Sequence, residues 1–133
     1  MSHKKYALFV GRFSPPHNGH IWLIGRKLTN GTPVLIAIRD TPYSENDPYS
    51  ASFRKSMLEA IFREEIQEGQ VRVIILPDIE SINYGRGVGY AVEEHEPPSE
   101  VAGISATELR RCLREEDTSW RERIPEAIWE MLE

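Results

Sequence analysis

The first 77 residues of the chain alternate between apolar runs and amphipathic stretches. The runs at 5–10, 33–38 and 71–76 are rich in Val, Ile and Leu and indicate β-strands. Between them, at 18–29 and 51–67, apolar residues recur at helical spacing and predict two helices. Strands that alternate with helices predict a βαβαβ unit, in which a parallel sheet is connected by right-handed crossovers.

The pattern after residue 77 is less regular. Residues 81–84 and 90–92 indicate a short fourth and fifth strand, and a glycine-rich stretch over 85–90 lies between them. That stretch is either a flexible turn or a place where the backbone approaches a ligand. We therefore expect a Rossmann-like α/β fold, a three-layer αβα sandwich with a mostly parallel sheet of about five strands. Residues 1–133 then form a single domain.

Two further helices are expected near the C-terminus. Ser105 and Glu108 form the Ser-x-x-Glu pattern of a capping box, which predicts a helix over 106–116. A last helix begins at Pro125, since proline suits the first helical position.

Composition and charge narrow the function classes. The formal net charge is −5 and no basic run exceeds two residues, which argues against a broad nucleic-acid-binding surface. The single cysteine, Cys112, excludes an internal disulfide and a multi-cysteine metal site, and its helical spacing from Leu109 favours a buried apolar role. No apolar run of membrane length and no signal peptide is seen, so we expect a soluble cytoplasmic protein with no membrane partner.

Residues 11–20 (GRFSPPHNGH) are the strongest candidate for chemistry. They form a Gly/Pro-rich turn that leaves the first strand and enters the first helix, with His17 and His20 at the junction. A helix N-terminus suits a phosphate group, and an imidazole there adds a donor or a positive charge. In the alternative interpretation, the segment is only a tight turn, Asn18 only caps the helix, and the histidines lie on the surface.

Other candidates lie where ligands bind in open α/β sheets, beyond the carboxyl ends of strands. The polar loop 39–50 follows the second strand and begins with Arg39 and Asp40. Arg54 lies in the first turn of the next helix, where the helix dipole disfavours a cation. We therefore expect it to bind either a ligand or a carboxylate of the loop. In the alternative interpretation it lies on a solvated face. Arg86 is a candidate contact to a phosphate or a base.

The segment 11–20 resembles the first signature of the nucleotidylyltransferase superfamily, His-x-Gly-His. Residues 104–110 (ISATELR) resemble its second signature, Ile-Ser-x-Thr-x-x-Arg. Within the superfamily, the chain is most similar to archaeal-type nicotinamide-nucleotide adenylyltransferases, and the likeness covers roughly 5–77 and 103–132. It fails between these ranges, where the chain is shorter and carries the glycine-rich stretch.

The resemblance implies transfer of an adenylyl group from ATP to the phosphate of a small acceptor, with release of pyrophosphate. Nicotinamide mononucleotide is the first guess for the acceptor, and Mg²⁺ bridges phosphate oxygens without a protein ligand. The catalytic residues are then His17, His20 and Arg110. The nucleotide-binding residues are Gly11, Arg12, Phe13, Ser14, Gly19, Ser105 and Thr107. The residues expected to contact the acceptor are Arg39, Asp40, Arg54, Tyr84 and Arg86.

Three other functions remain open at this point. The first is a cytidylyltransferase that uses CTP and an alcohol phosphate, although the Arg12-Phe13 variant of the first signature favours adenylyl transfer. The second is a non-catalytic nucleotide-binding or regulatory module, against which the intact histidines and Arg110 argue. The third is a protein-interaction domain, which predicts no triphosphate binding. Relatives often form homo-oligomers, so a homo-oligomer is also expected to be possible.

Overall fold

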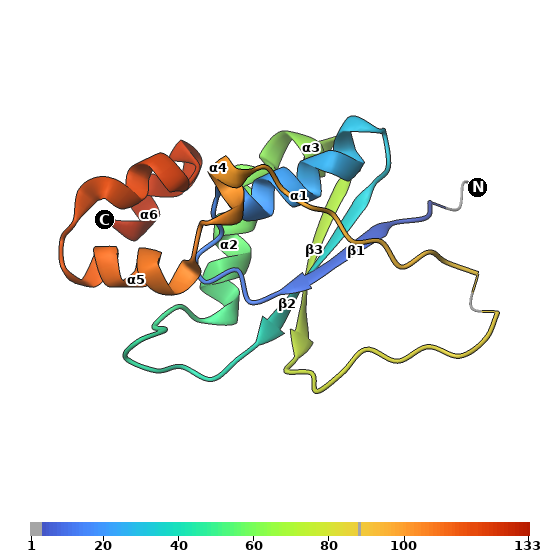
Figure 1. The fold of residues 1–133 in the computed structure, drawn as a ribbon, viewed down its shortest axis with the longest axis horizontal. Helices are drawn as coiled ribbons and strands as arrows, with labels where there is room; N and C mark the ends of the chain where they lie inside the picture. Colours follow the sequence, from blue (N-terminus) through green and yellow to red (C-terminus); the bar gives the residue numbers. More distant parts are fainter. Residues whose placement is uncertain (1–3, 88) are drawn as a thin grey trace.

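The computed structural model describes residues 4–87 and 89–133 and shows an α/β fold (Figure 1). The elements in chain order are β1 (Ala7–Gly11), α1 (Asn18–Thr29), β2 (Val34–Asp40), α2 (Ala51–Ile61), α3 (Arg63–Gln67), β3 (Val71–Pro77), α4 (Ser99–Ala102), α5 (Ala106–Arg114), the 3₁₀ turns η1 (Thr118–Arg123) and η2 (Glu126–Ile128), and α6 (Trp129–Leu132). The three predicted strands of the first half and the helix at 18–29 are confirmed.

Three helix predictions differ from the structure in their details. The helix expected over 51–67 is divided into α2 and α3 at Phe62, which leaves helical geometry and buries its ring in the core. The helix expected over 106–116 ends at Arg114, because Glu116 takes a left-handed conformation with φ of 58°. The last helix starts as a 3₁₀ turn after Pro125 and becomes α-helical at Trp129.

The sheet is wholly parallel, and β2 lies between β1 and β3. The βαβαβ prediction is therefore confirmed, but the expected count of about five strands is wrong for the residues that the structure describes. Residues 81–84 and 90–92 are not strands there. They show the alternation of a strand, yet Ile82, Tyr84, Tyr90 and Val92 are all 60% or more exposed, so no packed layer stabilises them. Val88 of the glycine-rich stretch lies outside the described residues.

The hydrophobic core lies on one face of this sheet. Val34, Ile36 and Ile38 of β2 are fully buried there against Ile24 of α1 and Leu58 of α2. On the opposite face, Leu8 is 55% exposed. No residue of that face joins either core cluster of the described chain, so the third layer of the predicted sandwich is missing from the described part of the chain.

The C-terminal elements pack on α2 rather than on the sheet. Their own apolar cluster consists of Met57, Leu109, Cys112, Trp120, Ile124 and Ile128. Cys112 is fully buried, as its spacing predicted. Figure 1 shows α5 and α6 to one side of the sheet, beyond α2.

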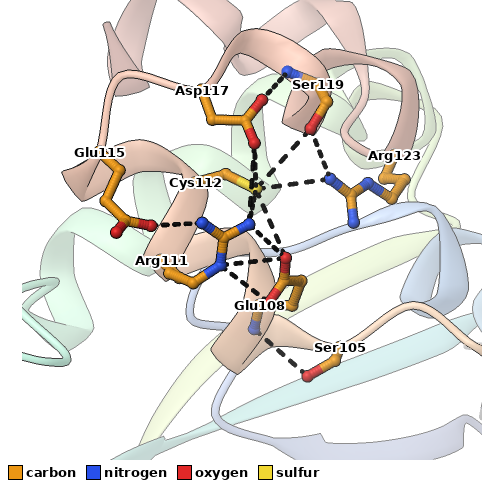
Figure 2. Close-up of polar contacts among 8 residues, drawn as sticks. All are labelled: Ser105, Glu108, Arg111, Cys112, Glu115, Asp117, Ser119 and Arg123. Atoms are coloured by element: carbon orange, nitrogen blue, oxygen red, sulfur yellow. Dashed lines mark hydrogen bonds and ion pairs between the residues drawn. The ribbon is translucent and has the colours of Figure 1, made fainter.

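Ser105 caps α5, but the predicted capping box is only half formed. The Ser105 hydroxyl accepts a hydrogen bond from the Glu108 N–H at 3.3 Å. The Glu108 carboxylate does not return to Ser105, because it binds the Arg111 guanidinium one turn along the helix (Figure 2). No helix among residues 4–87 and 89–133 is long and apolar enough to cross a membrane.

The one-sided core predicts unequal costs for two strand substitutions. Ile36→Ala removes a fully buried side chain and should lower the free energy of unfolding by about 2–5 kcal/mol. Leu8→Ala, in the neighbouring strand, should cost less than about 1 kcal/mol, because its side chain is already half in water. Urea unfolding of both variants checks this, and similar losses would show that the second face is covered.

Candidate functional site

The turn between β1 and α1 folds back tightly on itself. Phe13 adopts a positive φ of 51°, which costs about 1–3 kcal/mol for a residue with a side chain, and its ring is buried. A Cβ atom at Gly11 would lie 3.2 Å from that ring, so any larger residue would require the ring to shift by a few tenths of an ångström. The turn continues through a cis bond between Ser14 and Pro15, and both residues are buried.

The two histidines of the turn cap α1. His17 is the N-cap residue, and its Nδ1 accepts a hydrogen bond from the Gly19 N–H at 3.0 Å. His20 Nδ1 accepts one from the His17 N–H, also at 3.0 Å, and the two rings stack with their centroids 3.8 Å apart. The alternative in which Asn18 caps the helix is wrong, since Asn18 is the first helical residue and its amide donates to the Glu122 carbonyl.

Both imidazoles are neutral donors at pH 7. Burial lowers the pKa of His17 to about 4. Burial, and then the nearby His17, lower the pKa of His20 to about 3. Because each Nδ1 accepts a backbone N–H, the single proton of each ring sits on Nε2. Of the two properties expected from the sequence, the site therefore offers N–H donors rather than positive charge.

Arg110 brings the second signature to this turn. Its guanidinium is buried and donates from Nη1 to the Ser14 carbonyl at 2.6 Å and from Nε to the Asn46 carbonyl at 2.8 Å. Its Nη2 donates to the Thr107 hydroxyl at 3.3 Å. Two motifs that lie 96 positions apart in the sequence are thus joined by a direct hydrogen bond.

Arg54 holds the same turn from α2. It is fully buried, and its Nη1 donates to the Arg12 carbonyl at 2.7 Å and to the Arg39 carbonyl at 2.9 Å. Its Nε donates to the Tyr49 carbonyl at 3.0 Å. The partners of this first-turn arginine are therefore three backbone carbonyls and the Thr41 hydroxyl, to which Nη2 donates at 3.4 Å, and not the loop carboxylate that its position suggested. Its expected contact with an acceptor stays a prediction.

Asp47 is a residue of this site that sequence reasoning did not assign. It lies in the loop between β2 and α2, is 8% exposed, and accepts a hydrogen bond from the Ser14 hydroxyl. Its Oδ2 lies 3.8 Å from Nη2 of Arg12. The available signal was an aspartate before a proline in a loop that follows a strand, which is also typical of an ordinary turn.

The remaining predicted residues occupy two other places. Ser105 and Thr107 lie at the N-terminus of α5, exposed, beside Arg110. Arg39 and Asp40 end β2, and the Arg39 side chain pairs with Asp78 beyond β3 at 2.9 Å.

The predicted acceptor contacts Tyr84 and Arg86 are not brought to the turn. Both are exposed. In Figure 1 the yellow segment that follows β3 runs away from the entry into α1.

This arrangement suits an anionic ligand. The N-termini of α1 and α5 converge here, since α5 supplies the arginine that binds Ser14. Two imidazole N–H groups and the partly exposed Arg12 guanidinium add donors.

The chain is similar to one protein family and to several known proteins. The family model described as cytidylyltransferase-like matches residues 8–82. A nicotinamide-nucleotide adenylyltransferase of Caldivirga maquilingensis is 29% identical, with 92% of this chain and 84% of the relative covered. Proteins of the same name from Pyrobaculum arsenaticum and Thermococcus kodakarensis are each 30% identical, with 95% and 96% of this chain and 86% and 82% of the relatives covered.

Two glycines of α1 provide a matched test of the capping geometry. A Cβ atom at Gly19 would lie 2.8 Å from Cε1 of His17, so Gly19→Ala should displace that ring and cost about 1 kcal/mol of stability through the lost cap. Gly25 has open space around it, and Gly25→Ala should stabilise the protein by about 0.5–1 kcal/mol through helix propensity. Denaturant unfolding measures both changes, and two variants that are equally stabilised would refute the geometry.

The buried histidines also predict how stability depends on pH. In the unfolded chain both imidazoles take up a proton near pH 6.5, whereas in the folded chain they resist it down to about pH 4 and 3. Their contribution is present above pH 6.5 and is lost as the pH falls, by about 2 kcal/mol per histidine at pH 5. A His17→Asn/His20→Gln double variant should therefore lose about 4 kcal/mol less than the wild type between pH 7 and 5. Equal losses in chemical denaturation would contradict this.

Proposed function

This chain belongs to the cytidylyltransferase-like family of nucleotidylyltransferases, and we propose that it moves an adenylyl group from ATP to the phosphate of a small acceptor, releasing pyrophosphate. The observation that supports this most strongly is the hydrogen bond from Arg110 to the Ser14 carbonyl. It joins the two signature segments into a single site beside the neutral histidine pair. A non-catalytic module that had only kept the fold would need neither the buried Arg110 bond to Ser14 nor the neutral histidine pair beside it.

The proposed reaction is a direct displacement at phosphorus. An oxygen of the acceptor phosphate forms a bond to the α-phosphorus of ATP, and the bond from that phosphorus to the oxygen bridging to the β-phosphate breaks. The electron pair of that bond leaves with pyrophosphate. The acceptor phosphate is already a nucleophile, so no residue has to form a covalent intermediate. The protein therefore acts by positioning the reactants and stabilising charge.

The histidines supply donors where charge builds up. We assign the Nε2–H groups of His17 and His20 to the oxygens of the α-phosphate and of the leaving pyrophosphate. A neutral imidazole is suited to this role, because its hydrogen bond strengthens as negative charge develops while it carries no charge that must be desolvated in the empty site. The Nδ1 bonds fix both rings in advance.

The second signature is assigned to the β- and γ-phosphates. Ser105, Thr107 and the α5 N-terminus lie exposed beside Arg110, so they are accessible to a ligand. Arg12 is the most accessible guanidinium on the turn, with 44% of its side chain exposed, and we assign it to the triphosphate as well. Arg54 is proposed to position the turn, because its donors are used by backbone carbonyls and by the Thr41 hydroxyl.

We treat the magnesium ion as part of the triphosphate substrate. Among the residues that the structure describes, no three His, Cys, Asp or Glu side chains gather to hold a metal ion. Phosphate oxygens and water supply the hard oxygen ligands that Mg²⁺ prefers.

Nicotinamide mononucleotide is the first acceptor to test, because the similar proteins carry that substrate in their names. The assignment is proposed although the likeness to those enzymes is expected to fail over residues 78–102, where the chain is shorter.

The test is pyrophosphate release with Mg²⁺, measured for ATP and CTP against nicotinamide mononucleotide, other mononucleotides and simple alcohol phosphates. We expect turnover with ATP and nicotinamide mononucleotide, and His20→Ala should lower kcat by about 10²–10⁴-fold. Glu64→Ala, at an exposed position of α3, is the control and should leave kcat unchanged. Turnover only with CTP and an alcohol phosphate would favour the cytidylyltransferase, and an active, folded His20→Ala variant would refute the role of that residue.

A further inference from the structure

Asp47 is a buried carboxylate to which the mechanism above gives no part. It is 8% exposed, and one of its oxygens accepts a hydrogen bond from the Ser14 hydroxyl on the phosphate-binding turn. The other oxygen lies 3.8 Å from the Arg12 guanidinium. A carboxylate placed beside a site for a triphosphate repels the substrate, so its position requires a compensating role.

The loop that carries Asp47 is fixed on both sides. The carbonyl of Asn46 accepts from Arg110 and that of Tyr49 accepts from Arg54. The Asp47 N–H donates to the Ser44 hydroxyl at 3.1 Å. These bonds tie the loop on either side of Asp47 to the two buried arginines.

The charges around Asp47 are mainly positive. Burial lowers the pKa of both Arg54 and Arg110, and the negative charge of Asp47 acts in the opposite direction on each. Arg12 is the third cation of this group, and it is the one whose side chain is partly exposed. Asp47 thus provides a negative charge among three arginines: Arg12 on the turn itself, and Arg54 and Arg110, which bind the turn from α2 and α5.

We infer that Asp47 is a positioning residue for the transfer, which fixes the turn through the Ser14 hydroxyl and holds Arg12 in place by competing with the triphosphate for its guanidinium. This inference rests on the proposed function. In the free protein the Arg12 guanidinium lies 3.8 Å from the Asp47 carboxylate, which orients it. When the triphosphate binds, its phosphate oxygens replace the carboxylate as the partner of this guanidinium. The competition with Asp47 weakens the binding of ATP, and in return the Arg12 guanidinium is correctly oriented during the displacement at phosphorus.

The consequence is an opposite effect of Asp47→Asn on binding and on rate. The amide oxygen can still accept the Ser14 hydroxyl, but the charge that competes for Arg12 is removed. We expect the Kd of ATP, measured by calorimetry, to tighten about three- to ten-fold, while kcat falls about ten-fold or more. A merely structural defect lowers the active fraction and the binding stoichiometry, and it does not tighten Kd.

Glu45→Gln is the matched control, because it removes the same charge from an exposed position of the same loop. Neither Kd nor kcat should change in it. In a second test, Asp47→Ala should lower kcat further than Asp47→Asn in the wild type but no further than Asp47→Asn in a Ser14→Ala background, since only the alanine variant also breaks the hydrogen bond to the Ser14 hydroxyl.

The outcomes separate this inference from the proposed function. A wild-type chain that binds ATP and releases pyrophosphate, beside an Asp47→Asn variant with unchanged or weakened binding, overturns the inference alone. Additive losses in the Asp47 and Ser14 variants also overturn it. A wild-type chain that neither binds ATP nor releases pyrophosphate overturns the proposed function, and the inference falls with it.

Discussion

The site depends on two buried guanidinium groups that hold one turn by its backbone. Arg54 binds the carbonyl of Arg12, and Arg110 binds the carbonyl of Ser14. A buried charge is tolerated only when its donors are used, so each arginine demands several carbonyls in a fixed arrangement. The turn, the end of β2 and the loop before α2 provide them. The strained Phe13 conformation persists because the surroundings fix the residues on both sides of it.

This arrangement explains why the histidines of the site are neutral and the arginines carry its positive charge. Burial makes charged imidazoles costly, so the histidines remain neutral and offer Nε2–H donors. Permanent positive charge is left to the arginines, which stay protonated even when buried. Asp47 balances them within the protein, and the net charge of −5 on the whole chain is no obstacle to a locally cationic site.

The sequence was sufficient for the features that depend on local pattern. The periodicity of 18–29 and the apolar runs of β1, β2 and β3 were enough to predict those elements, because each buries a regular face. The strands expected at 81–84 and 90–92 failed, since alternation alone cannot supply a packing partner. The histidine cap was missed because asparagine is the commoner cap. Asp47 and the carbonyl partners of Arg54 arise from contacts between distant segments, which single-sequence patterns do not encode.

The exposed connector at 78–98 has a thermodynamic consequence for the evolution of such a chain. It joins β3 to α4, and in Figure 1 its first part runs apart from the helices, whereas its return part passes α1, where Glu93 pairs with Lys27 at 2.6 Å. The entropy of closing a loop rises only slowly with length, by about 0.6 kcal/mol for each doubling. Insertions and deletions here are therefore nearly neutral for folding, while the bonds from Arg54 and Arg110 to the turn are unaffected. A lineage can exchange this segment, and with it the groups available to a second substrate, without rebuilding the centre that handles phosphate.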